Sequence, residues 1–155
     1  MTPIPLGRET SEQGNLKILG IATVGQLLTI TAVVEWLVAL ALILAPGATV
    51  ALLLGAETDS AGLMIGRVAG AALLSLGIAC WGARTDLGGA ARSGTLRAIT
   101  FYNAGAGLLL VVFAVTGKAG GMMVWSAGVL HLGLASGFAA SLRRCGDTSS
   151  AKSET

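Results

Sequence analysis

The chain has 155 residues, of which 54% are hydrophobic and 12% are charged, and its formal net charge is +2. A soluble domain usually has about a quarter of its residues charged, so this composition argues against a water-soluble globule. An apolar chain with so little net charge is not typical of a disordered protein either. The length allows one small domain or a few membrane spans.

Four apolar stretches follow one another along the chain, each close to the ~20 residues with which a helix crosses a ~30 Å hydrocarbon core. We expect spans at about residues 25–45, 61–81, 98–116 and 122–142. The polar connections between them are short, so consecutive helices should be antiparallel neighbours. The sequence therefore predicts an all-α protein whose residues 18–145 form an up-and-down bundle of four transmembrane helices.

The segments around these spans have their own patterns. The first span should end at Ala45-Pro46-Gly47, because Pro removes a backbone donor and Gly relaxes the chain. The apolar piece 48–55 that follows is too short to cross, so we expect it at the interface or against the bundle. Residues 1–17 form a polar arm and residues 146–155 a polar tail, both cytoplasmic, and we expect the tail and most of the arm to be mobile.

The basic residues predict the orientation. One side of the predicted membrane carries eight of the ten Lys and Arg residues, in the arm, the second connection and the tail: Arg8, Lys17, Arg84, Arg92, Arg97, Arg143, Arg144 and Lys152. Lys118 lies on the other side with Glu57 and Asp59. Because Lys and Arg concentrate in cytoplasmic loops, both termini are expected in the cytoplasm.

Glycines at a spacing of four residues predict helix packing. Gly62, Gly66 and Gly70 share one face of the second span, and Gly133 with Gly137 form a similar face on the fourth. Helices in lipid associate through close backbone contact, which small residues allow. These faces could pack helices within one chain or form a homodimer, and the pattern leaves both open.

Polar residues inside the spans predict a cluster. Glu35, Arg67 and His131 can reach a similar depth, and small residues flank them as they flank Asn103, next to Tyr102, so these groups are expected to face inward. In one interpretation Arg67 and Glu35 form a buried ion pair that fixes helix register. In the other, the cluster is a site for a proton, an ion, or a small amphiphile such as a lipid or quinone.

Other site chemistries lack support in the sequence. No metal-ligand spacing, phosphate loop or catalytic motif occurs, so no metal, no catalytic residue and no enzymatic activity are expected. Haem is not expected, because His131 has no obvious axial partner at matching depth. Lys and Arg do not alternate with aromatic residues, so nucleic-acid binding is not expected.

One order of residues resembles a known group. Pro46 and Leu53-Leu54-Gly55 precede a short loop, then come Gly66-Arg67-Val68-Ala69-Gly70, Leu76-Gly77 and Trp81. This resembles the small bacterial four-span membrane proteins that include the DoxX-like families. The resemblance implies a four-helix bundle in the bacterial inner membrane and transfers no catalytic residue.

Two functions are therefore expected for this protein. The first is that of an accessory or scaffold subunit, or of a binder of a small lipophilic molecule; the partners would be the lipid bilayer and other membrane subunits or a second copy of the chain. The alternative is a proton-coupled small transporter or channel that uses Glu35.

Overall fold

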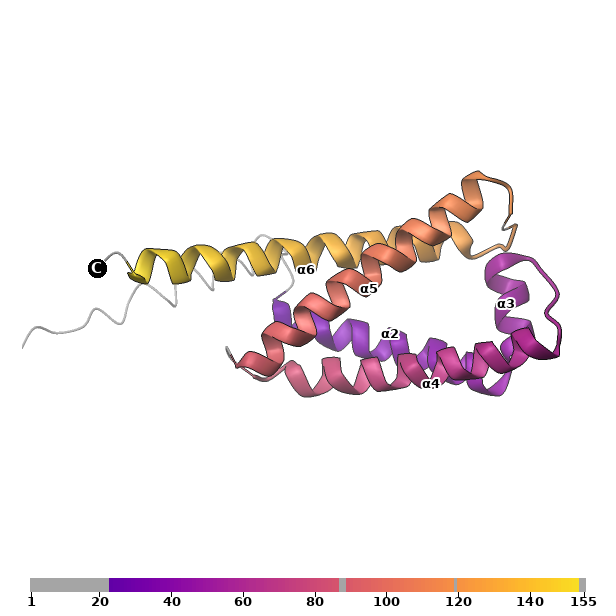
Figure 1. Ribbon diagram of the computed structural model, residues 1–155, viewed down its shortest axis with the longest axis horizontal. Helices are drawn as coiled ribbons and strands as arrows, with labels where there is room; N and C mark the ends of the chain where they lie inside the picture. Colours follow the sequence, from indigo (N-terminus) through magenta and orange to yellow (C-terminus); the bar gives the residue numbers. More distant parts are fainter. Residues whose placement is uncertain (1–22, 87–88, 119, 154–155) are drawn as a thin grey trace, which may run out of the picture.

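The computed structural model describes residues 23–86, 89–118 and 120–153, and every regular element within these ranges is a helix. The long helices are α2 (Val24–Leu44), α4 (Ser60–Ala83), α5 (Ala90–Val115) and α6 (Val124–Ser153), and the short helix α3 (Pro46–Leu54) joins α2 to α4 (Figure 1). Each of the four long helices contains a segment long and apolar enough to cross a membrane. The predicted all-α bundle of four transmembrane-length helices is confirmed.

Side-chain caps and proline set several helix ends. The Thr23 hydroxyl accepts a hydrogen bond from the Gln26 backbone N–H at the start of α2, and Gln26 in turn accepts from the Thr23 N–H, which satisfies two free donors. Asp59 caps α4 by accepting from the Gly62 N–H at 2.8 Å. Helix α2 ends at Leu44, as predicted, because Pro46 cannot continue its hydrogen-bond ladder.

Two helices extend further than the sequence predicts. Helix α5 begins at Ala90 rather than near residue 98, because residues 90–97 contain no Pro and several good helix formers. Helix α6 continues to Ser153, through most of the segment that was expected to be a mobile tail. The arm at residues 1–17 lies outside the described residues.

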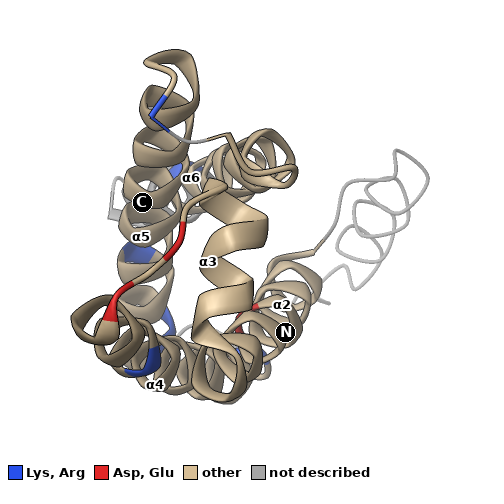
Figure 2. Ribbon diagram, turned by 90° about the vertical axis from the view of Figure 1, so that its right-hand side faces the viewer, with Lys and Arg blue, Asp and Glu red and all other residues tan. Residues whose placement is uncertain are grey.

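The long helices form two pairs, α2 with α4 and α5 with α6, which pack closely within each pair and contact each other less. The two pairs spread apart toward the end that carries α3, which lies across that end of the bundle (Figures 1 and 2). We call this the α3 end. The opposite end, where α2 begins and α4 passes to α5, is called the tail end.

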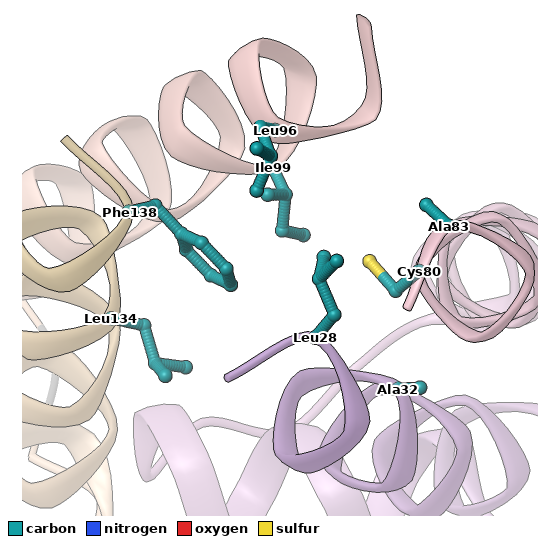
Figure 3. Close-up of a cluster of buried hydrophobic side chains, with 8 residues drawn as sticks. All are labelled: Leu28, Ala32, Cys80, Ala83, Leu96, Ile99, Leu134 and Phe138. Atoms are coloured by element: carbon teal, nitrogen blue, oxygen red, sulfur yellow. The ribbon is translucent and has the colours of Figure 1, made fainter. Parts of the chain in front are cut away.

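At the tail end an apolar cluster, which we call the plug, joins all four long helices. Figure 3 shows its side chains pointing toward one another. The plug consists of these eight buried residues: Leu28, Ala32, Cys80, Ala83, Leu96, Ile99, Leu134 and Phe138. It closes the space between the two helix pairs on the tail side.

Backbone contacts attach α3 to the connection between α5 and α6. The carbonyl oxygen of Leu54 accepts from the Gly120 N–H at 2.9 Å, and that of Leu52 accepts from the Met123 N–H at 3.3 Å. Gly121 lies against the Leu53 backbone, where a Cβ would not fit. Gly55 ends α3 with φ of 71°, a left-handed conformation that favours glycine. The α3 helix thus bridges the two pairs.

The outer surface of the bundle is apolar. Large hydrophobic side chains on all four long helices are exposed, among them Leu37, Val68, Phe101 and Val129. Exposed apolar side chains on every long helix are unfavourable in water and suit a lipid environment. The fold is therefore that of a multi-pass membrane protein.

Candidate functional site

Polar side chains from three helices lie next to the plug, on the side that faces the α3 end. Thr31 follows Leu28 of the plug by one turn of α2, and Asn103 follows Ile99 by one turn of α5. Helix α6 runs in the opposite direction, so His131 lies one turn on the α3 side of Leu134. We call the set Thr31, Glu35, Tyr102, Asn103 and His131 the polar cluster. It lies near the middle of the spans.

Asn103 and His131 join α5 to α6. The Asn103 side-chain N–H donates to the Ile99 carbonyl at 2.8 Å, so its oxygen is the atom that faces His131 Nδ1, also at 2.8 Å. An amide oxygen only accepts, and Nδ1 therefore carries the hydrogen. In the neutral imidazole this leaves Nε2 as a hydrogen-bond acceptor.

Tyr102 connects this pair to Glu35. Its ring meets the His131 ring edge-on, with centroids 5.7 Å apart and an interplanar angle of 84°. Its phenol lies near the Glu35 carboxylate. The cluster thus runs continuously from α6 through α5 to α2.

Glu35 has unused hydrogen-bonding capacity. Its side chain is 2% exposed, and Oε1 has no hydrogen-bond partner among the described residues. The hydroxyl of Thr31, one turn away on the same face of α2, is also buried and without a partner there. Buried polar atoms are almost always satisfied, because leaving one unpaired costs about 1–3 kcal/mol and more for a charged group. These two oxygens therefore mark a place where a further group can bind.

Arg67 does not belong to this cluster, which corrects one expectation from the sequence. Its side chain is exposed on the surface of α4, while Glu35 is buried. The neighbours Gly66 and Gly70 face α2, and one residue along a helix turns the side chain by about 100°. Arg67 is therefore turned out of the bundle, and the ion pair offered as one interpretation is not formed.

The predicted glycine faces differ in what they contact. A Cβ on Gly66 would lie 3.1 Å from the Pro46 side chain, and one on Gly70 would lie 2.8 Å from the Ala39 carbonyl oxygen. Both glycines therefore pack α4 against the α2–α3 segment. Gly62 instead meets Thr58 of its own connection.

On α6, a Cβ added to Gly137 would lie 3.5 Å from the Leu27 side chain, which is an ordinary van der Waals contact. Gly133 is exposed, and a Cβ added to it would have no neighbour within 4 Å. Gly133 therefore does not pack the helices of one chain, which was one of the two roles that its spacing left open. The close approach of α5 to α6 occurs instead at Gly107, where a Cβ would lie 2.8 Å from Leu132. The small stripe around Asn103 contains Gly107 and was the available signal for this contact.

Thr31 and Trp36 were not predicted as site residues. Thr31 lies four residues before Glu35, a spacing that places both on one helix face and could have indicated it. The indole of Trp36 packs against Trp81 of α4, with centroids 5.4 Å apart, and its buried N–H has no partner in the part of the chain that the structure describes. Only the packing of α2 on α4 reveals this further unpaired group.

A shallow apolar hollow lies further toward the α3 end. It has a volume of about 190 Å³ and is lined by Leu54, Leu109, Leu110 and Phe113. Leu109 follows Asn103 by six residues on α5, which corresponds to roughly 9 Å along the helix axis. Helix α5 thus carries two members of the polar cluster, Tyr102 and Asn103, and most of the wall of an apolar hollow.

The described residues contain no group of three or more His, Cys, Asp and Glu side chains that could hold a metal ion. The cluster can instead supply hydrogen bonds to a small polar group. Comparison with known proteins gave no match: no family model, no curated protein and no solved structure matches this chain significantly. The resemblance to the DoxX-like proteins stays a prediction.

Proposed function

We propose that this protein is a non-enzymatic membrane protein that binds a small lipophilic molecule, such as a lipid or quinone, inside its helix bundle. The observation that carries the proposal is the Glu35 carboxylate, buried in the middle of the spans with Oε1 unpaired. Intramembrane ionisable groups are costly and are usually functional. A ligand whose polar part meets Glu35 and Thr31 would satisfy both oxygens.

The apolar surroundings support an amphiphilic ligand. The plug blocks the tail side of the cluster, whereas the two helix pairs diverge on the α3 side (Figure 1). The hollow at Leu109 and Phe113 offers an apolar surface in that direction. A polar head at Glu35 and an apolar tail running toward the hollow would match this sequence of environments.

The location that we propose is a bacterial cytoplasmic membrane, with both termini in the cytoplasm. Arg84 follows α4, and Arg92 and Arg97 lie in the first part of α5, at the tail end, while Glu57, Asp59 and Lys118 lie in the connections of the α3 end. This charge distribution supports the proposed orientation, since basic residues favour the cytoplasmic side. The ligand would then enter from the outer leaflet.

The test compares wild type, Glu35→Gln and Glu57→Gln, purified in a mild detergent and examined by native mass spectrometry. We expect wild type and Glu57→Gln to retain a lipophilic molecule that Glu35→Gln loses. The control makes the same chemical change at an exposed position of the α3–α4 connection. Equal retention of all bound molecules by the three proteins would contradict a binding site at Glu35.

A proton-coupled transporter or channel is the second candidate, and the buried carboxylate directly above the plug favours it. Glu35 would then bind the proton, and movement of the plug would open the path to the tail end. In reconstituted vesicles with a pH gradient, Glu35→Gln should abolish pH-driven substrate or proton flux. Flux that is unchanged by this substitution would remove the transporter proposal.

A further inference from the structure

We infer that the ligand of the polar cluster is an amphiphilic amine, whose ammonium group binds Glu35 and whose alkyl chain runs toward the α3 end. This inference rests on the proposed function and specifies the chemistry of the head group. It follows from which atoms of the cluster lack partners and from which charges are missing around them.

Two of the unpaired atoms on α2 are oxygens that share one helix face, whereas the third, the Trp36 N–H, lies on the side that packs against α4. Glu35 Oε1 and Thr31 Oγ1 are both buried, lie one turn apart on one helix face, and have no partner within the described ranges. The Tyr102 phenol adds a third oxygen close to the carboxylate. An ammonium group has three N–H donors and no acceptor, so one compact group can satisfy all three oxygens.

The charge of Glu35 leads to the same head group. A buried carboxylate stays ionised only with a partner of opposite charge or several hydrogen bonds, and without them it takes up a proton. Arg67, which the sequence places at a similar depth in the membrane, is turned to the outer surface. The Nδ1 atom of His131 is hydrogen-bonded to Asn103. A cationic head group would supply the charge that the described part of the protein does not place beside Glu35.

Other lipophilic head groups fit less well. An alcohol has one hydrogen to donate and therefore leaves the carboxylate charge uncompensated. A quinone carbonyl only accepts hydrogen bonds, so it cannot pair with the oxygens of an ionised Glu35. A primary ammonium group is also compact, about the size of a methyl group, which suits the buried position of Glu35.

The position of the apolar hollow predicts the course of the chain. From Asn103 to Phe113 helix α5 advances by about 15 Å, and the side chains that line the hollow at its far end are all apolar. An extended alkyl chain attached to an ammonium at Glu35 would run along this face of α5. Its end would lie between Leu54 and Leu110.

The experiment uses dodecylamine, with dodecanol as a neutral probe of the same chain length. Binding to the full-length protein in detergent is followed by tryptophan fluorescence, because Trp36 adjoins Glu35. Each probe is titrated into wild type, Glu35→Gln, Thr31→Val and Glu57→Gln under identical conditions. The fraction of probe that enters the detergent micelles is then the same for all four proteins. Circular dichroism and gel filtration verify that the variants are folded.

Wild type and Glu57→Gln should bind dodecylamine at least tenfold more tightly than dodecanol. Glu35→Gln should remove this preference, and Thr31→Val, which keeps the side-chain shape, should weaken amine binding several-fold. If Glu35→Gln does not fold, an unchanged amine affinity in Thr31→Val overturns the inference.

Two further outcomes separate the inference from the proposed function. If dodecanol binds wild type as tightly as dodecylamine and both depend on Glu35, the ammonium head group is wrong but the site stands. If neither probe binds wild type better than Glu35→Gln, and no native molecule is lost from that variant, both the head group and the binding function are contradicted.

Discussion

Asn103 organises the polar cluster because it uses both halves of its amide. The N–H donates to the Ile99 carbonyl of its own helix, and the oxygen accepts from His131 on α6. The first bond fixes the orientation of the side chain, and the second joins two helices at the depth of Glu35. The edge-on contact of Tyr102 with His131 then holds the phenol beside the carboxylate.

Asn103→Ala should therefore destabilise the protein by about 1–2 kcal/mol, because it removes one interhelical hydrogen bond and leaves the Nδ1–H of His131 unpaired. Unfolding in detergent, followed by loss of helical circular dichroism, measures the effect. A matched control is Thr100→Ala on the same helix, whose hydroxyl donates only to the Leu96 carbonyl of its own helix, and this change should cost less.

A double-mutant cycle with His131→Phe isolates the pair. The combined variant should lose less stability than the sum of the single variants, with a coupling of at least ~0.5 kcal/mol. Strict additivity would show that Asn103 and His131 do not stabilise one another.

At this scale the sequence predicts which residues are unusual better than it predicts where they point. Glu35, His131 and Asn103 are identifiable because polar groups are costly in apolar spans. The direction in which Arg67 points could not be predicted in the same way, because neighbouring positions on α4 face either α2 or the outer surface. The face that Arg67 occupies is decided by the packing of Gly66 and Gly70 against α2 and Pro46. The sequence of one helix does not reveal which other helix packs against it.

At the scale of elements, glycine determines how closely paired helices approach. A Cβ on Gly70 would come within 2.8 Å of the Ala39 carbonyl and 2.9 Å of the Ile43 side chain, so α2 and α4 pack through backbone contact there. Gly77 has the same role against Trp36, and Gly107 against Leu132 of α6. Each pair is thus held by surfaces that accept no larger residue.

Gly70→Val should separate α2 from α4 and cost about 1–3 kcal/mol of stability through overpacking. Gly133→Val is the matched control, because Gly133 is also within a long helix but has open space at its Cβ position. Both changes alter helix propensity equally, so the difference between them in detergent unfolding reports packing alone. Equal losses of stability would contradict the assigned interface.

The spans were predictable because length and hydropathy identify a membrane-crossing helix without knowledge of its neighbours. The position of α3 was not, because its attachment depends on backbone hydrogen bonds from Gly120 and Met123, far away in sequence. The early start of α5 was also hidden, since polar residues 90–97 read as a connection although they favour a helix.

At the scale of the whole molecule, the bundle is closed unequally at its two ends. The plug fills the tail end with side chains from all four long helices, whereas in the described part of the chain α3 bridges the α3 end (Figures 1 and 3). The polar cluster lies between these two closures. Access to Glu35 is therefore expected from the α3 end, and the side of the membrane that this end faces determines where the ligand comes from.

The topology is the measurement that tests this account most directly. Reporters of compartment are fused at the C-terminus and inserted, one at a time, beside Glu57 and beside Lys118. We expect the C-terminal reporter to lie in the cytoplasm and both inserted reporters to lie outside it, because four crossings place the connections of the α3 end opposite the tail end. If the C-terminal reporter and the one at Lys118 occupied the same compartment, α6 would not cross the membrane. His131 and Glu35 could then not share an intramembrane site.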